Sequence, residues 1–278
     1  MLSDKCDGHW PTAFVWEAQM TLRPLAAVAA AILLSGCGGA PPDKAVPDKG
    51  NPPRYTPENF SSRTSDAWLE SKTAHMTLAI GSGLNGVTCK GVVLNGSSVK
   101  TSGFQAKYKA PGPDFEMRAV KGIIYVNYGE LTQDKFIAID PGDSTNELSK
   151  QFAPLMQSMD PASTIRQFAG AITRVKRSGK PTAMDGVDTT PYAVTIDTDK
   201  LKDSPLFDAM PEGAIPEKLK YVYYMAEDDI PRRIVYDAGP LGDVIINFTK
   251  IGEPVDIVAP DKSDQIDQSI LKGAGATA

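Results

Sequence analysis

The stretch KLKYVYYMAEDDIPRRIVYD, residues 218–237, decides the fold. Its two ends, residues 218–225 and 232–237, are rich in aromatic and β-branched side chains, which are typical of β-strands. Between them lies Asp228-Asp229-Ile230-Pro231, whose composition is that of a turn. Two strands joined by so short a turn pair antiparallel, so this stretch predicts a hairpin and a sheet built from local pairings.

The sequence on both sides of this hairpin repeats the strand pattern. Residues 192–197 and 243–250 alternate between apolar and polar side chains, so each segment buries one face. The apolar positions are Tyr192, Val194, Ile196, Val244, Ile246 and Phe248. Further upstream, strands are predicted at residues 74–80, 87–94, 103–110, 115–121 and 123–128. Turns rich in glycine, Asn-Gly and proline separate them, so we expect a second antiparallel meander.

Helical periodicity replaces the strand pattern in two regions. Residues 59–72 form the first predicted helix, and its apolar contacts are Phe60, Trp68 and Leu69. A second helix is predicted over residues 147–159, with Ser144 and Glu147 as a capping box. Pro154 lies inside this helix and predicts a kink or a break.

A third helix is expected to open at Asp160 and to run to about Val175. Its apolar stripe consists of Ile165, Phe168 and Ile172. The polar tail after Pro260 is expected to fray. The whole pattern belongs to the α+β class, with a curved antiparallel sheet and helices packed on one of its faces. The apolar faces then either meet as a solid core or enclose a cavity.

The start of the chain has the pattern of a targeting signal rather than of a folded segment. Residues 20–36 hold Arg23, an apolar run and then small residues, which is the pattern of a signal peptide. The apolar run, residues 25–34, is about half the ~20 residues that a membrane span needs. Leu34-Ser35-Gly36-Cys37 matches the bacterial lipobox, in which diacylglycerol is attached to the cysteine thiol. Cys37 is therefore the expected site of lipid attachment.

The domain boundaries follow from this targeting signal. Residues 1–19 place acidic and tryptophan side chains ahead of the signal, so we expect Met20 to be the start and residues 1–19 to be a start-site artefact. Residues 37–57 hold the lipidated cysteine and a linker rich in proline and glycine, which cannot bury enough surface to fold. The folded domain is expected over residues 58–278. This organisation predicts a lipid-anchored protein on the extracytoplasmic face of the cell membrane.

Composition argues against several classes of function. The net charge is −5 and no long basic run occurs, so nucleic acid is not an expected partner. The chain has 2 histidines, His9 and His75, and no G-x-S-x-G motif, which disfavours a surface-anchored hydrolase and the common zinc chemistries. We therefore expect no enzyme activity, no catalytic residue, no metal site and no cofactor.

Three remaining motifs are interpreted as structural. GSGLNG, residues 81–86, leads into a strand-like segment rather than a helix, so it predicts a hairpin turn and not a dinucleotide site. Cys89 alternates within a strand and is expected to be a buried, unreactive thiol without a disulfide partner. The acidic residues at 197, 199 and 227–229 fall at strand ends and turns, where Asp is favoured, although residues 227–229 leave a weak calcium site open.

Three segments carry a resemblance to a known family. They are the lipobox at residues 34–37, ESKTAHMTLAI at residues 70–80 and FTKIGEPVDIVAP at residues 248–260. Together with the order of meander, helices and second meander, they resemble the LppX/LprG-type lipoproteins of actinobacteria, chiefly mycobacteria, over about residues 68–260. GSGLNGVTCKGVVLNG, residues 81–96, is richer in glycine than that family's pattern.

The resemblance implies a half-barrel of antiparallel strands with helices across its concave face, similar to the LolA/LolB carriers. It also implies an apolar cavity that holds acyl chains, a lipid or lipoglycan ligand carried outward from the membrane, and room for an envelope transport partner. From alternation and helical stripes, the candidate cavity residues are Phe115, Met117, Ile124, Val126, Leu155, Ile165, Phe168, Val194, Ile196, Val222, Ile246 and Phe248. The alternative is a lipoprotein sensing or interaction module with a filled core and a protein partner, and cavity volume separates the two.

Overall fold

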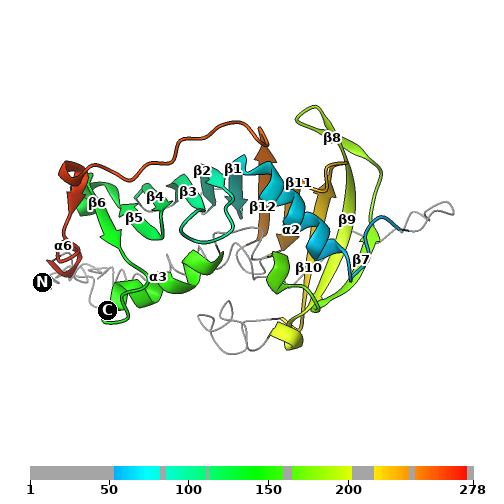
Figure 1. The fold of residues 1–278 in the computed structure, drawn as a ribbon, viewed down its shortest axis with the longest axis horizontal. Helices are drawn as coiled ribbons and strands as arrows, with labels where there is room; N and C mark the ends of the chain where they lie inside the picture. Colours follow the sequence, from blue (N-terminus) through cyan, green and yellow to red (C-terminus); the bar gives the residue numbers. More distant parts are fainter. Residues whose placement is uncertain are drawn as a thin grey trace, which may run out of the picture.

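One long, open sheet forms the body of the molecule (Figure 1). The computed structural model describes residues 53–81, 86–110, 113–158, 165–201, 216–237 and 242–273. The strands are β1 (Thr73–Ile80), β2 (Val87–Leu94), β3 (Gly103–Lys109), β4 (Phe115–Val120), β5 (Ile123–Asn127), β6 (Phe136–Ile139), β7 (Ile172–Arg177), β8 (Thr182–Met184), β9 (Val187–Asp197), β10 (Lys218–Met225), β11 (Pro231–Asp237), β12 (Asp243–Thr249) and β13 (Gln265–Ile266). The helices are α2 (Phe60–Ser71), α3 (Glu147–Ser158) and α6 (Ile270–Gly273), with short 3-10 turns η2 (Gly129–Thr132), η3 (Thr198–Leu201) and η5 (Lys262–Asp264).

The hairpin predicted from residues 218–237 is confirmed. Strands β10 and β11 pair antiparallel, with Tyr221 opposite Tyr236, and the register shifts by one position between Tyr224 and Met225. The turn contains Asp229 at a positive φ of 62°, a conformation that Asp tolerates better than most residues. Strand β12 then pairs with β11, which extends the hairpin into a meander.

The two predicted meanders join into one sheet through β1 and β12. Their pairing places Met76 opposite Phe248 and Leu78 opposite Ile246. The strand order is β13-β6-β5-β4-β3-β2-β1-β12-β11-β10-β9-β7, and β8 pairs with β9 beside this path. All pairs are antiparallel except β13 with β6. The first and last strands in this order are not paired with each other, so the sheet is open, and the α+β class with helices on one face is confirmed.

The two faces of the sheet differ in character because side chains alternate along each strand. We call one of them the inner face: on it, pairing aligns Phe248, Met76, Gly91, Ala106, Met117, Val126 and Ile137 across seven strands. The opposite, outer face carries charged groups such as Glu116, which pairs with Arg118 at 2.8 Å and Lys107 at 3.6 Å.

Helix α2 packs on the inner face. Its Trp68 ring lies 4.8 Å from that of Phe248 on β12, and its Phe60 ring lies 5.1 Å from that of Tyr223 on β10. In Figure 1, α2 crosses in front of β10–β12, while α3 lies alongside β4–β6. Phe152 of α3 is buried in the same apolar cluster as the inner-face residues, so both helices contribute to one interior.

Gly91 explains part of the glycine richness of residues 81–96. A Cβ atom at Gly91 would lie 2.4 Å from the Gln105 carbonyl oxygen and 2.7 Å from the Ala106 Cβ. Backbone of β3 therefore approaches β2 so closely that only glycine fits. GSGLNG connects the paired strands β1 and β2, so the hairpin is confirmed, although residues 82–85 lie outside the described ranges.

The predicted start of α3 at Glu147 is confirmed, but the predicted cap at Ser144 is wrong by two residues. Its cap is Asn146, whose Oδ1 accepts hydrogen bonds from the Leu148 and Ser149 amides at 2.9 and 3.4 Å. Asn146 directly precedes the first helical residue, which is the N-cap position. The predicted break at Pro154 is also wrong, because α3 continues to Ser158.

The predicted third helix does not reach Val175. Residues 165–167 are helical, the chain then turns through Gly170 at a φ of 82°, and β7 begins at Ile172. Val175 pairs with Val194 of β9. Ile172, Thr173 and Val175 are β-branched and find a partner strand, which outweighs the helical spacing. Residues 159–164, including the predicted opening at Asp160, lie outside the described ranges.

The segment after β12 packs back onto the sheet, and the fraying predicted after Pro260 does not occur as far as Leu271. The Glu253 carbonyl oxygen accepts a hydrogen bond of 2.7 Å from the Thr73 hydroxyl, and the Ile257 side chain approaches Gly103. Figure 1 shows this segment running back along the sheet to β13. There Gln265 and Ile266 pair with β6, and Leu271 is buried, so the segment from Pro260 to Leu271 belongs to the fold.

Candidate functional site

Most of the candidate cavity residues lie together in the interior. Ten of them are buried in one apolar cluster: Phe115, Met117, Ile124, Val126, Ile165, Phe168, Val194, Ile196, Ile246 and Phe248. Leu155 lies on α3, but its side chain is outside the described part of the structure, as is Cys37. The inner face thus gathers residues from both meanders that are more than 100 positions apart in the sequence.

Val222 is assigned to the wrong face. It pairs with Val235 and Ala193 on the outer face, and its neighbours Tyr221 and Tyr223 point inward instead. The sequence does contain a signal for the correct face of Val222. Lys218 and Lys220 alternate in phase with Val222, and because lysines face water, they place Val222 on the exposed face.

The alternation predicts that Tyr192 is buried, and this is confirmed, but the sequence interpretation missed four other inward tyrosines. Tyr55, Tyr221, Tyr223 and Tyr236 are also buried. Several pack ring against ring: Tyr55 and Tyr192 lie 4.8 Å apart at their centroids, and Tyr221 and Tyr236 lie 4.9 Å apart. The β9–β12 half of the inner face is therefore aromatic, whereas the centre, where Gly91 of β2 pairs with Ala106 of β3, has the smallest side chains.

Burial keeps the ionisable groups of this interior neutral. It raises the pKa values of Tyr221, Tyr223 and Tyr236 above the ordinary value for tyrosine. Burial also raises the pKa of the Cys89 thiol to about 12, although a hydrogen bond with Tyr108 opposes part of the shift. A thiol that stays protonated is not a nucleophile, so the interpretation of Cys89 as a buried structural residue is confirmed.

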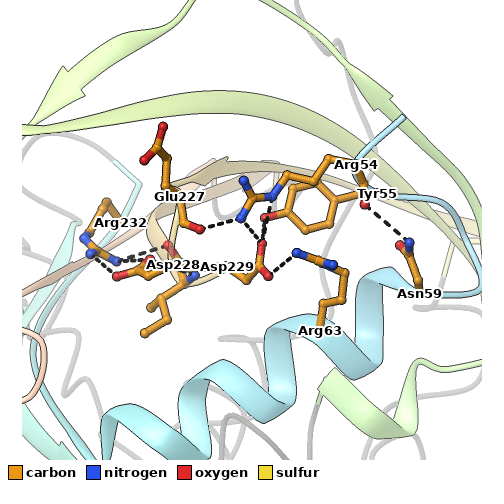
Figure 2. Close-up of polar contacts among 9 residues, drawn as sticks. Arg54, Tyr55, Asn59, Arg63, Glu227, Asp228, Asp229 and Arg232 are labelled. Atoms are coloured by element: carbon orange, nitrogen blue, oxygen red, sulfur yellow. Dashed lines mark hydrogen bonds and ion pairs between the residues drawn. The ribbon is translucent and has the colours of Figure 1, made fainter. Parts of the chain in front are cut away.

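A second group of polar residues surrounds Asp229 at the turn between β10 and β11 (Figure 2). The Asp229 carboxylate accepts hydrogen bonds from the Tyr55 hydroxyl at 2.5 Å, from Arg54 Nε at 2.9 Å and from Arg63 at 2.5 Å. Arg54 also donates to the Glu227 carbonyl oxygen. Burial alone raises the pKa of Asp229, but these hydrogen bonds and the charges of the arginines outweigh it and lower the pKa below the ordinary value.

These contacts argue against a calcium site at residues 227–229. Asp229 is held by two arginines, and Asp228 accepts hydrogen bonds from Arg232 at 2.6 and 3.2 Å. Guanidinium groups occupy the oxygens that a cation would need. Across the described ranges, no group of three or more His, Cys, Asp or Glu side chains is placed to hold a metal ion.

The contacts of Asp229 also show where the packed part of the chain begins. Tyr55 is 1% exposed and its ring contacts those of Phe60 and Tyr192. The expected boundary after residue 57 is therefore too late, and residues 54–57 belong to the fold. Within the part of the chain that the structure describes, no helix is both long and apolar enough to cross a bilayer.

Comparison with known proteins finds similarity in structure only. No protein-family model and no curated protein sequence match the chain. The structure is similar to LprF from Mycobacterium bovis, with 16% identity, a TM-score of 0.48 and coverage of 73% of this chain and 96% of that one. It is similar to the lipoprotein LppX from Mycobacterium tuberculosis, with 15% identity, a TM-score of 0.49 and coverage of 73% and 98%. A complex of MucA and MucB from Pseudomonas aeruginosa matches at 12% identity, a TM-score of 0.35 and coverage of 74% and 59%.

Proposed function

We propose that this chain is a membrane-tethered extracytoplasmic lipoprotein that binds the acyl chains of a lipid between the inner face and helices α2 and α3. The supporting observation is the continuity of the inner face. Apolar side chains from both meanders form one continuous surface on it. An acyl chain exposed to water costs about 0.8 kcal/mol per CH₂ group, so a carrier needs a continuous apolar surface of this kind.

The centre of the inner face suits an extended chain. Gly91 and Ala106 pair at the middle of the strand order, with the small side chain of Cys89 nearby on β2. Larger residues such as Met117 and Phe248 flank them on either side. Small side chains in the middle of a curved face leave room for methylene groups, and large ones beside them supply contacts.

The residues around Asp229 would fix the point at which the N-terminal tether joins the domain. Cys37, once lipidated, would stand 17 residues before Arg54, and a chain of that length spans at most about 60 Å. Arg54 and Tyr55 are fixed to the β10–β11 turn and to α2 through Asp229. The tether would therefore leave the domain at a defined point beside the aromatic half of the inner face.

Native mass spectrometry of the chain purified from its own envelope, followed by organic extraction, tests the proposal. We expect a discrete added mass that extracts as lipid. A bare protein mass, together with failure to take up offered phospholipid, would contradict lipid binding and would favour an interaction module with a filled core.

A matched pair of variants locates the binding surface. Ala106→Phe places a ring on the inner face, whereas Ala193→Phe places the same ring on the outer face. We expect Ala106→Phe to lose bound lipid and Ala193→Phe to keep it, with circular dichroism showing that both retain the sheet. Equal lipid content in the two folded variants would place the lipid elsewhere.

A further inference from the structure

Two polar side chains on the buried face of helix α2 have no hydrogen-bond partner among the described residues. Its buried face consists of Phe60, Ser61, Thr64, Ser65 and Trp68. The Ser61 hydroxyl donates to the Ile165 carbonyl oxygen, and the Ser65 hydroxyl donates to that of Ser62 at 3.0 Å. Thr64 Oγ1 and Trp68 Nε1 have no hydrogen-bond partner within the described ranges, although both residues are 0% exposed.

A third unpartnered atom, Asn95 Oδ1, belongs to a residue that contacts the C-terminal half of α2. Asn95 Nδ2 donates to the Trp68 carbonyl oxygen at 3.3 Å, and this fixes the orientation of the amide. Asn95 is buried, and its Oδ1 accepts no hydrogen bond. The indole of Trp68 is a donor, the Asn95 oxygen is an acceptor, and the Thr64 hydroxyl is both.

Trp68 joins this group to the proposed lipid surface. Trp68 packs edge-on against Phe248, a candidate cavity residue on β12. A buried polar group without a partner is costly, and such groups are rare in native proteins. Thr64 and Trp68 lie one helical turn apart on the buried face of α2, and Asn95 contacts the Trp68 backbone, so a bound molecule that supplied hydrogen-bond partners here would remove this cost.

The surroundings define the charge of that partner. The charged residues of α2 on either side, Arg63, Asp66 and Glu70, are exposed to water. None of the three unpartnered residues carries a charge, so a phosphate, carboxylate or ammonium group here would be buried without a counter-charge. The site is suited to an uncharged group. Such a group could accept a hydrogen bond from the Trp68 indole or the Thr64 hydroxyl, or donate one to the Asn95 amide oxygen.

We propose that Thr64, Trp68 and Asn95 form a hydrogen-bonding site for an uncharged polar group, an ester carbonyl or a hydroxyl, on the apolar ligand held at the inner face. This inference rests on the proposed lipid-binding function. It adds that the ligand carries such a group and that α2 fixes the position of that group.

Ligands of equal chain length test the site. We would use the full chain with Trp10→Phe and Trp16→Phe, which leaves Trp68 as the sole tryptophan and its fluorescence as a local signal. Methyl laurate and 1-dodecanol offer the polar group, and dodecane lacks it. We expect the ester and the alcohol to bind about 5-fold more tightly than dodecane and to shift Trp68 emission, since one hydrogen bond is worth about 1 kcal/mol.

Conservative variants assign the preference to these residues. Thr64→Val has the same shape without the hydroxyl, and we expect it to remove most of the 5-fold preference, whereas Thr64→Ser keeps it. For Trp68→Phe, displacement of an apolar dye replaces tryptophan fluorescence. Thr64→Val should also melt at a higher temperature without ligand, because it removes an unpartnered buried group.

The outcomes separate this inference from the function it rests on. Binding of all three ligands with equal affinity, in the parent chain and in Thr64→Val, would overturn the polar site and leave lipid binding intact. Failure of dodecane, ester and alcohol alike to bind would overturn both. A preference that survives in Thr64→Val and Trp68→Phe would also overturn the assignment to α2.

Discussion

Raising the pH above 10 should unfold the protein in one steep transition. Among the groups that drive it are five buried tyrosines: Tyr108, Tyr128, Tyr221, Tyr223 and Tyr236. Burial raises the pKa of each above the value of about 10 that it has in the unfolded chain. The folded state therefore keeps protons that the unfolded state releases, so the stabilisation is complete below pH 10 and is lost as the pH rises.

The number of groups sets the steepness. Each tyrosine that ionises only on unfolding lowers the free energy of unfolding by about 1.4 kcal/mol per pH unit above 10. Five such groups lower it by about 7 kcal/mol per pH unit. Because domains of this kind have about 5–15 kcal/mol of stability, the transition should fall between about pH 11 and pH 12.

Two signals measured together check this reasoning. Circular dichroism reports the sheet, ultraviolet absorbance reports tyrosinate, and we expect the two to change at the same pH. Tyr223→Phe removes one ionising group whose pKa shift is due to burial alone, so the slope should fall by about 1.4 kcal/mol per pH unit. Tyrosinate absorbance that reaches its full amplitude while the sheet persists would refute the argument, because the buried tyrosines of the inner face would then be open to water.

Three further perturbations have defined outcomes. Asp229→Asn should lower the free energy of unfolding at pH 7 by about 1–3 kcal/mol, chiefly through the bond to buried Tyr55, and urea titrations should show the difference vanishing as the pH falls below about 4 through the lowered pKa of Asp229. Cys89 should react with iodoacetamide at the rate of global unfolding, and mass spectrometry showing rapid labelling of the native protein would contradict its burial. Gly91→Ala should cost about 1–3 kcal/mol in the same titrations, because its Cβ would overlap the Gln105 carbonyl oxygen, and an unchanged midpoint would mean that β2 and β3 separate easily.

Strand positions could be predicted where alternation was long and one face was apolar. Strand β2 was predicted with its observed bounds, and β10 likewise, because each has eight residues between clear turns. Strand β6 has four residues, three of them buried, and β13 has two, so neither shows a period that can be read. The helical spacing of Ile165, Phe168 and Ile172 predicts a helix that runs into β7, and only the pairing of β7 with β9 decides against it.

Contacts between distant residues could not be predicted at all. Arg54 and Asp229 are 175 positions apart, and Asp229 by itself reads as an ordinary turn residue. The sequence therefore suggested an exposed acidic turn where the structure has a carboxylate surrounded by arginines and a tyrosine. The same limit applies to Asn95, whose role at the end of α2 depends on the hairpin bringing it to Trp68.

Burial alone does not separate a ligand-binding face from a core, because both select apolar side chains at the same alternate positions. The ten buried candidates fit either interpretation. Unpartnered polar atoms do separate them, since a filled core has no use for a buried group that it leaves unsatisfied. Among the described residues, such atoms include those of Thr64 and Trp68 on α2, Asn95 after β2 and Ser149 on α3. Under the proposed function, a polar ligand group that enters between α2 and the sheet would meet the first three of these atoms.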